Sequence, residues 1–430
     1  MIKTINSRHT YIFFLTIITL LPISLILGPA ISLINVLIIS FSFLIMCFFF
    51  ENYQFLKRRE FLLLVALNFY LIFNSFISLD FYSGFARNFG FLRFILLFLL
   101  INYFFFRFEN TNKLFNTWLI LIVFISIDVF IESIFGRNLV GFGRIEINGV
   151  PQPNGTRIVS FFKDEPVAGA FIYGFSFIVL GYLFNRYSKD KKNIVIILFL
   201  SLLFFTSVLI TGERSNTMKF FIGLMVFFLF FDFLKKKVRI FSILFFIIAV
   251  LTVFSQSQYL KMRYITQLTD QFTREDKREI FFKRNIYINL YKSGINVFKN
   301  YPIFGVGNKN YRVESCAPKK DPKTYYLCTT HPHQLYIEFL SEHGLFGTII
   351  LLSILFFLIF RILGVIIKSK NYIQAGCFIY ILTNFIPLLP SGSFFNDFNS
   401  TIFWINFSLM YACNKQTNIF YKQDLKLKTT

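Results

Sequence analysis

Long polar stretches are nearly absent from this chain of 430 residues. Hydrophobic residues make up 55% of it, and the mean hydropathy is +0.61. These values exclude an ordinary soluble protein of this length. Runs of about 18 or more apolar residues recur along the chain, the length that a membrane-spanning helix needs. The composition therefore predicts an all-α polytopic membrane protein.

A cleavage site for a signal peptide is also missing. Lys3 and Arg8 precede the first apolar stretch, as they would in a signal peptide. However, no convincing small-x-small cleavage site follows that stretch, and another apolar run begins at once. We therefore expect the first stretch to remain as an uncleaved span.

Acidic residues are few, with 22 Asp and Glu against 44 Lys and Arg, and the formal net charge is +22. In a soluble protein this excess would favour nucleic-acid binding. In a membrane protein, basic cytoplasmic loops and anionic lipid headgroups explain it first. We therefore expect membrane lipids, and no nucleic acid, among the partners.

The apolar runs predict about twelve transmembrane helices of about 20 residues each. Their expected ranges are 11–28, 30–50, 61–79, 89–106, 114–135, 167–184, 193–211, 217–234, 239–256, 345–361, 372–390 and 399–414. Every second connection is basic, which indicates an even number of spans and both termini in the cytoplasm. This layout predicts four parts: spans one to nine over 1–256, a large periplasmic loop over 257–344, spans ten to twelve over 345–414 and a cytoplasmic tail over 415–430.

The large loop breaks the positive-inside trend, because residues 257–333 hold 14 Lys and Arg against 6 Asp and Glu. Long loops cross the membrane largely regardless of charge. Residues 286–298 have apolar side chains at helical spacing, so the loop is expected to be partly helical. Its charge has two interpretations, which are binding of a polyanion such as a pyrophosphate, or contact with anionic lipid.

Of the five cysteines, two lie in the large loop and the other three lie in predicted spans. Cys316 and Cys328 are expected to form a disulfide, because the periplasm is oxidising. The alternative is a zinc site that adds His331 and His333. Its spacing lacks the usual close cysteine pair, so the disulfide is favoured and no metal is predicted.

The chain has only four histidines, and three of them lie within 331–343, where the large loop meets the next span. This segment also carries Glu338 and Glu342, one helical turn apart. A general base needs a group that titrates near neutral pH, which favours His333 with His331 beside it. The alternative is an amphipathic side chain at the membrane interface.

Arg214 lies in a short outside turn, 211–216, between two predicted spans. A charged side chain so close to hydrocarbon is costly unless it is paired or functional. One interpretation is pairing with Glu213 or with a lipid phosphate. The other is a guanidinium that binds a phosphate of the substrate.

Further charged residues lie near the fifth and sixth spans. Arg157 precedes the sixth span, and Glu165 with Pro166 is expected to begin that helix as a cap and first-turn pair. Arg157 and Glu165 are each either structural or functional. Asp128 and Glu132 lie inside the fifth span, where a functional role and a helix-packing role are both open.

Several of these residues resemble the O-antigen ligase and polymerase family, which are bacterial inner-membrane glycosyltransferases. The pattern is Pro302-x-x-Gly305-x-Gly307, then His333-Gln-x-Tyr336-x-x-x-Leu340-x-Glu342-x-Gly344-x-x-Gly347. The Arg214 turn resembles that family's Ser-Arg turn, with Glu213 in place of Ser. Gln334 replaces the Asn that usually follows the family's histidine. The motifs cover roughly residues 150–350.

The resemblance implies a helical architecture of the glycosyltransferase-C type. It also implies a metal-independent, inverting transfer of a glycan from an undecaprenyl pyrophosphate carrier at the periplasmic face, with no cofactor. The acceptor is a second lipid-linked glycan, lipid A-core or a protein, so polymerase and ligase both fit. His333 is then the base, Arg214 the main pyrophosphate ligand and Arg157 a second one. The other expected substrate-binding residues are Arg87, Arg312, His331, Glu342 and Glu165.

The alternative function is a lipid-linked sugar flippase or polysaccharide transporter. A transporter predicts charged residues deep in several spans and helices broken at mid-membrane. Ionisable residues that the sequence indicates to be clearly buried are few here, namely Arg93, Asp128 and Glu132. Because the polar chemistry gathers outside the spans, transfer is favoured over transport.

Overall fold

A computed structural model describes residues 7–50, 53–143, 146–147, 150–151, 157–163, 165–188, 190–230, 236–266, 286–318 and 326–421. The first half of the chain forms α1 (Ser7–Thr19), α2 (Leu21–Leu27), α3 (Pro29–Cys47), η1 (Gln54–Lys57), α4 (Arg59–Phe76), α5 (Phe81–Gly90), α6 (Leu92–Arg107), α7 (Asn112–Phe135), η2 (Ser160–Phe162), α8 (Ala168–Tyr187) and α9 (Lys191–Ile210). The second half forms α10 (Arg214–Phe230), α11 (Lys236–Gln256), α12 (Gln258–Leu260), the π-helix η3 (Lys261–Thr266), α15 (Ile286–Asn300), α16 (Tyr311–Cys316), α17 (Leu335–Arg361), α18 (Leu363–Ser369), α19 (Tyr372–Asn384) and α20 (Asp397–Ala412). Two short strands, β1 (Glu146–Ile147) and β2 (Val150–Pro151), pair antiparallel.

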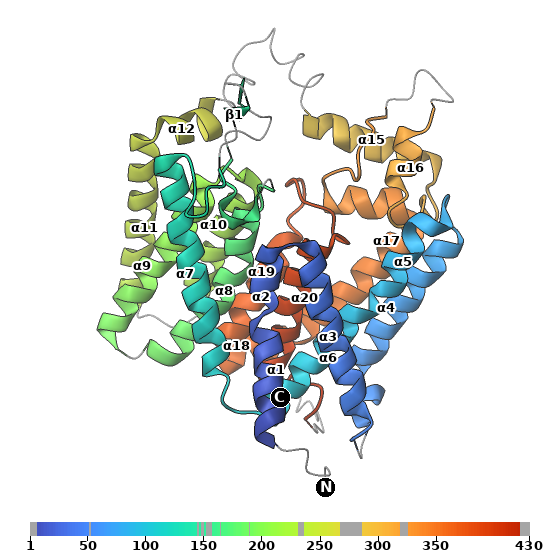
Figure 1. The fold of residues 1–430 in the computed structure, drawn as a ribbon, viewed down its shortest axis with the longest axis horizontal. Helices are drawn as coiled ribbons and strands as arrows, with labels where there is room; N and C mark the ends of the chain where they lie inside the picture. Colours follow the sequence, from blue (N-terminus) through green and yellow to red (C-terminus); the bar gives the residue numbers. More distant parts are fainter. Residues whose placement is uncertain are drawn as a thin grey trace.

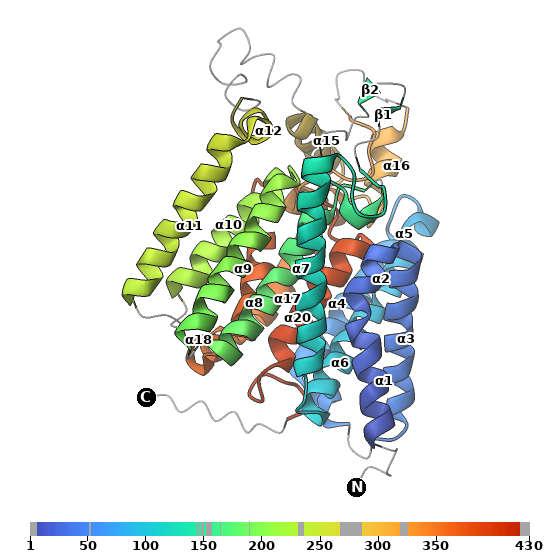
Figure 2. The same cartoon turned by 60° about the vertical axis from the view of Figure 1, so that its left-hand side comes forward.

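The long helices run side by side, and both termini lie at the same end of the bundle (Figures 1 and 2). We term this the terminal end. The opposite end carries α12, α15, α16 and the β1–β2 pair, and we term it the loop end (Figure 1). The polar segments of the chain therefore gather away from both termini.

Seven helices or joined helices among the described residues are long and apolar enough to cross a membrane. They are Pro29–Cys47, Arg59–Phe76, Phe81–Arg107, Asn112–Phe135, Ala168–Tyr187, Lys192–Ile210 and Leu335–Ser369. The pair α1–α2, bent by 40°, makes eight if it counts as one span. The prediction of a helical polytopic membrane protein is confirmed. The remaining predicted spans coincide with α10, α11, α19 and α20, so a count of twelve stays a prediction.

Helix α8 lies at the centre of the bundle, with 89% of its apolar stretch buried. It packs closely on α19, because glycines remove side chains where the two backbones meet. A Cβ added at Gly181 would collide with the Tyr372 carbonyl, and one at Gly376 would collide with the Phe177 carbonyl. Small residues at such contacts are how membrane helices gain close packing.

The glycine pattern of the 302–307 segment has a structural cause. This segment follows α15, and its backbone binds α17 where α17 bends at Gly344. Val306 N–H donates to the Ser341 carbonyl at 3.0 Å, and Leu345 N–H donates to the Pro302 carbonyl at 2.8 Å. Gly305 has a φ of 68°, and a Cβ there would collide with the α17 backbone. The motif therefore holds the large loop on α17.

Candidate active site

The α9–α10 turn lies at the loop end and places Arg214 as the first residue of α10. Gly212, with a φ of 76°, lets the chain reverse between the two helices. Burial lowers the pKa of the Arg214 guanidinium, and the charges of Arg263 and Arg157 lower it further, while Tyr264 and Tyr287 raise it. Three arginines therefore gather at the end of this turn, although they are far apart in sequence.

Arg263 reaches this position because η3 is attached to the α9–α10 turn. The Tyr264 hydroxyl donates to the Leu209 carbonyl at 3.0 Å and lies 3.0 Å from the Thr217 hydroxyl. The Arg263 guanidinium then donates to the Gly212 carbonyl, with both N–O distances at 3.3 Å. Nothing in the sequence distinguishes Arg263 from the other basic residues of the loop, because the carbonyl that it binds belongs to the distant α9–α10 turn.

Two buried acids of α7 hold the segment that carries Arg157. Val159 N–H donates to Glu132 Oε1 at 3.1 Å, and Ser160 N–H donates to Glu132 Oε2 at 2.6 Å. The Ser160 hydroxyl donates to Asp128 Oδ2 at 2.6 Å. Both carboxylates are at most 1% exposed. Of the two interpretations left open, the structure gives these acids a structural role, which is to fix the Arg157 segment.

Glu213 does not point at Arg214 but caps the N-terminus of α8. Its carboxylate accepts hydrogen bonds from Gly169 N–H at 2.6 Å, Ala170 N–H at 3.1 Å and the Asn216 amide at 2.7 Å. Burial raises the pKa of Glu213 to about 7, although the hydrogen bonds and the charge of Arg157 lower it. The first N–H groups of a helix need acceptors, and here a distant side chain supplies them.

The prediction that Glu165 and Pro166 cap the sixth span is wrong. Helix α8 begins later, at Ala168, and its N-cap residue Val167 makes no side-chain cap hydrogen bond. The Glu165 side chain is exposed. The reason is that Glu213 already occupies the capping position, which no local pattern around residue 165 can indicate.

His333 lies just before α17, in a left-handed conformation with a φ of 55°. The next residue, Gln334, caps α17 by accepting a hydrogen bond from Ile337 N–H at 2.8 Å. The His333 carbonyl accepts one from Ser391 N–H at 2.9 Å. Burial lowers the pKa of the His333 imidazole, and the charge of Arg157 lowers it further. The ring is therefore held neutral at neutral pH, the form that a general base requires.

His331 packs against His333, with ring centroids 3.9 Å apart. Burial lowers the pKa of His331 to about 3, and the charge of His333 acts in the same direction, while the Ser391 backbone raises it. Both rings are thus neutral neighbours. The charge of Arg157 lowers the pKa values of Glu213, Arg214 and His333, so its guanidinium lies within electrostatic range of each.

Arg157 thus lies within electrostatic range of both Arg214 and His333, and the three residues come from separate segments at the loop end. Arg263 joins them, and Tyr287 of α15 contacts the His333 ring with centroids 6.5 Å apart. We refer to these five residues as the loop-end cluster. In this cluster, fixed positive charge lies beside a neutral imidazole.

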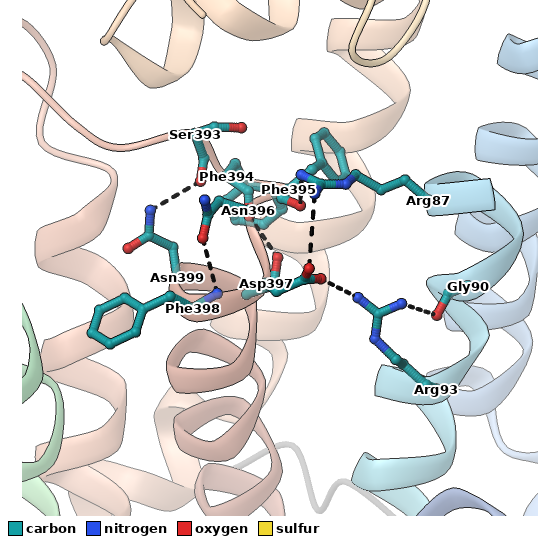
Figure 3. A network of polar contacts seen from close by, with 11 residues as sticks. Arg87, Gly90, Arg93, Ser393, Phe394, Phe395, Asn396, Asp397, Phe398 and Asn399 are labelled. Atoms are coloured by element: carbon teal, nitrogen blue, oxygen red, sulfur yellow. Dashed lines mark hydrogen bonds and ion pairs between the residues drawn. The ribbon is translucent and has the colours of Figure 1, made fainter. Parts of the chain in front are cut away.

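Arg87 lies outside this cluster. Its guanidinium donates to the Phe395 carbonyl at 2.6 Å and forms an ion pair of 3.8 Å with Asp397 (Figure 3). Arg93 also binds Asp397, and donates to the Gly90 carbonyl at 3.0 Å (Figure 3). Both arginines therefore fasten α5 and α6 to the start of α20, an arrangement that explains why Arg93 is tolerated inside a span.

Of the other expected substrate-binding residues, only His331 contacts the cluster in the described part of the chain, through the His333 ring. Arg312 is exposed on α16. Glu342 is 2% exposed, and its carboxylate accepts hydrogen bonds from the backbone of Lys309 and Tyr311. It therefore attaches the large loop to α17. These positions give no support to a substrate role for Arg87, Arg312, Glu342 or Glu165, which stays a prediction.

Cys316 and Cys328 are joined in a disulfide, with Cα atoms 4.5 Å apart. This is the pairing that the sequence predicts, and it connects the end of α16 with the segment before His331. Among the described residues, no group of three or more His, Cys, Asp and Glu is placed to hold a metal ion. The two sulfurs of the zinc alternative are instead bonded to each other.

Comparison with known families decides which family this arrangement represents. Residues 198–352 match the family model described as O-antigen ligase. This part of the chain belongs to the O-antigen ligase family. The O-antigen ligase domain contains Arg214, Arg263 and His333, whereas Arg157 comes from outside it. No curated protein matches the chain. The match confirms the resemblance and implies a glycosyltransferase-type enzyme in a membrane.

Proposed function

We propose that this protein transfers a glycan from an undecaprenyl pyrophosphate carrier to a sugar hydroxyl at the periplasmic membrane surface, as an O-antigen ligase or a surface polysaccharide polymerase. The observation that carries this proposal is the convergence of Arg157, Arg214 and His333 at the loop end. The O-antigen ligase domain supports the same reaction class. The turn with Arg214 directly follows a membrane-spanning helix, which suits a substrate whose phosphates lie at headgroup level.

The arginines of the cluster act on the leaving group. During transfer, the bond between the anomeric carbon and the pyrophosphate oxygen breaks, and negative charge develops on the pyrophosphate. Arg214 and Arg157 bind these oxygens through charge-assisted hydrogen bonds. Cations fixed before the reaction stabilise developing charge best, because they need no reorganisation. The reaction then proceeds without a metal ion.

His333 acts on the acceptor. As the acceptor oxygen bonds to the anomeric carbon, its proton passes to the neutral imidazole of His333. The Arg157 charge lowers the pKa of His333, so the ring is in the neutral form that can take up a proton when the reaction begins. A single attack on the face opposite the pyrophosphate inverts the anomeric configuration.

The proposal is tested with His333→Ala and Arg214→Ala in cells that lack the native gene. We expect each variant to reach the membrane but to lower glycan transfer by about a hundredfold or more. Gel analysis of surface glycan measures this. His9→Ala and Arg186→Ala, at exposed positions of α1 and α8, are the matched controls. Normal glycan with either variant removes that residue from the mechanism.

In the deletion strain, single-repeat products indicate a polymerase, and long chains left on the carrier indicate a ligase.

A further inference from the structure

Lys219 of α10 is buried deep in the bundle, with an exposed fraction of 3%. Its ammonium donates to Asn384 Oδ1 at 3.3 Å. The Asn384 amide nitrogen donates to the Tyr380 carbonyl at 2.9 Å, which fixes the amide oxygen toward Lys219. The partner that the structure gives to Lys219 is therefore a neutral group.

The ion pairs among the described residues do not involve Lys219. They join Arg87 and Arg93 to Asp397, and Arg361 to Glu60. Asn384 is the last residue of α19, and a helix C-terminus carries about half a negative charge. This eases the burial of the ammonium without neutralising it, and buried charges are normally paired.

Lys219 faces a pocket rather than packed side chains. The pocket offers about 80 Å³ of space to the centre of a water molecule, and it is partly open to its surroundings. Its polar lining is Asn216, Lys219, Asn384, Ser391 and Asn399, and its aromatic lining is Tyr173, Tyr380, Phe394 and Phe403. A few polar groups among aromatic rings suit one sugar ring, whose C–H face packs on an aromatic ring and whose hydroxyls bond to amides. Asn399, one of the lining residues, donates a hydrogen bond to the Ser393 carbonyl at 3.0 Å (Figure 3).

The pocket adjoins the loop-end cluster. Asn216 lines the pocket and donates to Glu213, the residue next to Arg214. Ser391 lines it as well, and its N–H binds the His333 carbonyl at 2.9 Å. A sugar ring bound here therefore lies beside the base and the α9–α10 turn.

We infer that this pocket binds a sugar ring that bears one carboxylate, of the uronic acid type, and that Lys219 is the counter-ion of this carboxylate. The inference rests on the proposed function, because it assigns the pocket to the glycan substrate. One buried cation can balance the charge of one carboxylate. A pyrophosphate carries more negative charge, and the proposed mechanism already assigns it to the arginines of the loop-end cluster. Lys219 is then a specificity-determining residue for acidic glycans.

The test measures binding of two monosaccharides to the purified full-length protein by saturation-transfer NMR. Glucuronic acid and glucose share the same ring, and differ only in a carboxylate in place of a hydroxymethyl group. We expect glucuronic acid to bind about tenfold tighter than glucose, as for one charge-assisted hydrogen bond. Lys219→Met should remove this preference. Lys309→Met, at an exposed lysine, should retain it.

Asn384→Asp is a second variant that does not depend on removing the lysine. It gives Lys219 a carboxylate partner of the same shape as the amide, so the fold should be kept while the preference for glucuronic acid is lost. Equal binding of both sugars to the native protein would overturn the inference, as would a preference that survives Lys219→Met. Displacement of glucuronic acid by inorganic pyrophosphate would assign Lys219 to the carrier instead.

This experiment separates the pocket from the reaction. Binding needs no transfer, so His333→Ala should keep the preference for glucuronic acid while glycan transfer is lost. If transfer is lost but no preference exists, only the acidic-sugar inference fails. If the preference exists but His333→Ala transfers normally, the proposed mechanism fails and the pocket stands.

Discussion

His333 shows how a single residue depends on a neighbour that is far away in sequence. Its imidazole is buried, and Arg157 adds positive charge nearby. Both effects disfavour the protonated ring. Arg157 therefore has two roles in the proposed reaction, since it binds the leaving group and keeps the base neutral.

The second role predicts a shift in the pKa of His333. Replacing Arg157 with Gln removes a positive charge, so protonation becomes easier and the pKa of His333 should rise, while Arg157→Lys should change it little. NMR titration of the histidine ring protons measures this directly, because the chain has only four histidines. If the Arg157→Gln variant keeps some activity, the fall of its kcat/KM at acidic pH should begin at a higher pH than in the native protein. An unchanged pKa of His333 in the Arg157→Gln variant would contradict the electrostatic effect of Arg157 on His333.

At the scale of the helix, α8 shows that the first N–H groups of a membrane helix can depend on acceptors from a distant segment of the chain. Its first N–H groups lie in the interior, where no water can satisfy them. Glu213 supplies both acceptor oxygens, and the same carboxylate binds Asn216 at the rim of the Lys219 pocket. The α9–α10 turn thus fixes the start of α8 and the active site together.

Glu213→Ala is expected to lower the thermal stability of the protein in detergent. Two helix N–H groups lose their acceptors, and each buried unsatisfied group costs about 1–3 kcal/mol. The melting temperature from intrinsic fluorescence measures the loss. Glu165→Ala is the matched control, because this acid is near α8 but exposed, and its melting temperature should stay within error. Equal effects of the two variants would mean that Glu213 does not cap α8.

At the scale of the whole molecule, the two ends of the bundle carry different segments of the chain. Both termini lie at the terminal end, while α12, α15 and α16 lie at the loop end (Figure 1). Helix α8 begins beside Glu213 at the loop end, so its last turn, with Arg186, lies at the terminal end. That both termini lie in the cytoplasm stays a prediction.

This polarity predicts the outcome of cysteine labelling in intact cells. In a background in which Cys47, Cys377 and Cys413 are replaced, Arg312→Cys should react with a membrane-impermeant maleimide from outside. Arg186→Cys should react only after the membrane is opened, because the predicted topology places the terminal end in the cytoplasm. Labelling of residue 312 from the cytosol alone would invert the topology. Periplasmic glycan intermediates would then never reach His333.

Local patterns in the sequence predicted several features correctly. The apolar spacing over 286–298 predicted a helix, and α15 spans Ile286–Asn300. The spacing Pro302-x-x-Gly305-x-Gly307 indicated a distinct motif, which the structure places on the bend of α17. Each of these depends on backbone preferences or on periodicity within one segment, so neighbouring residues are enough to indicate it.

Features that depend on contacts between distant segments could not be predicted in this way. The cap of α8 comes from Glu213, 44 residues away from Gly169, so Glu165 was the wrong choice. Asp128 and Glu132 could be read as catalytic or structural until their hydrogen bonds to the 159–160 backbone were known. Arg87 could be taken for a phosphate ligand until its ion pair with Asp397 was seen.

The sequence by itself determined that this is a helical membrane protein with an O-antigen ligase domain, because hydropathy and motif spacing are local properties. It also indicated His333, Arg214 and Arg157. Only the tertiary structure decided that these residues meet, that Arg263 joins them and that Lys219 faces a pocket beside them. The physical reason is that burial and charge pairing depend on which helices pack together, and here those helices come from both halves of the chain.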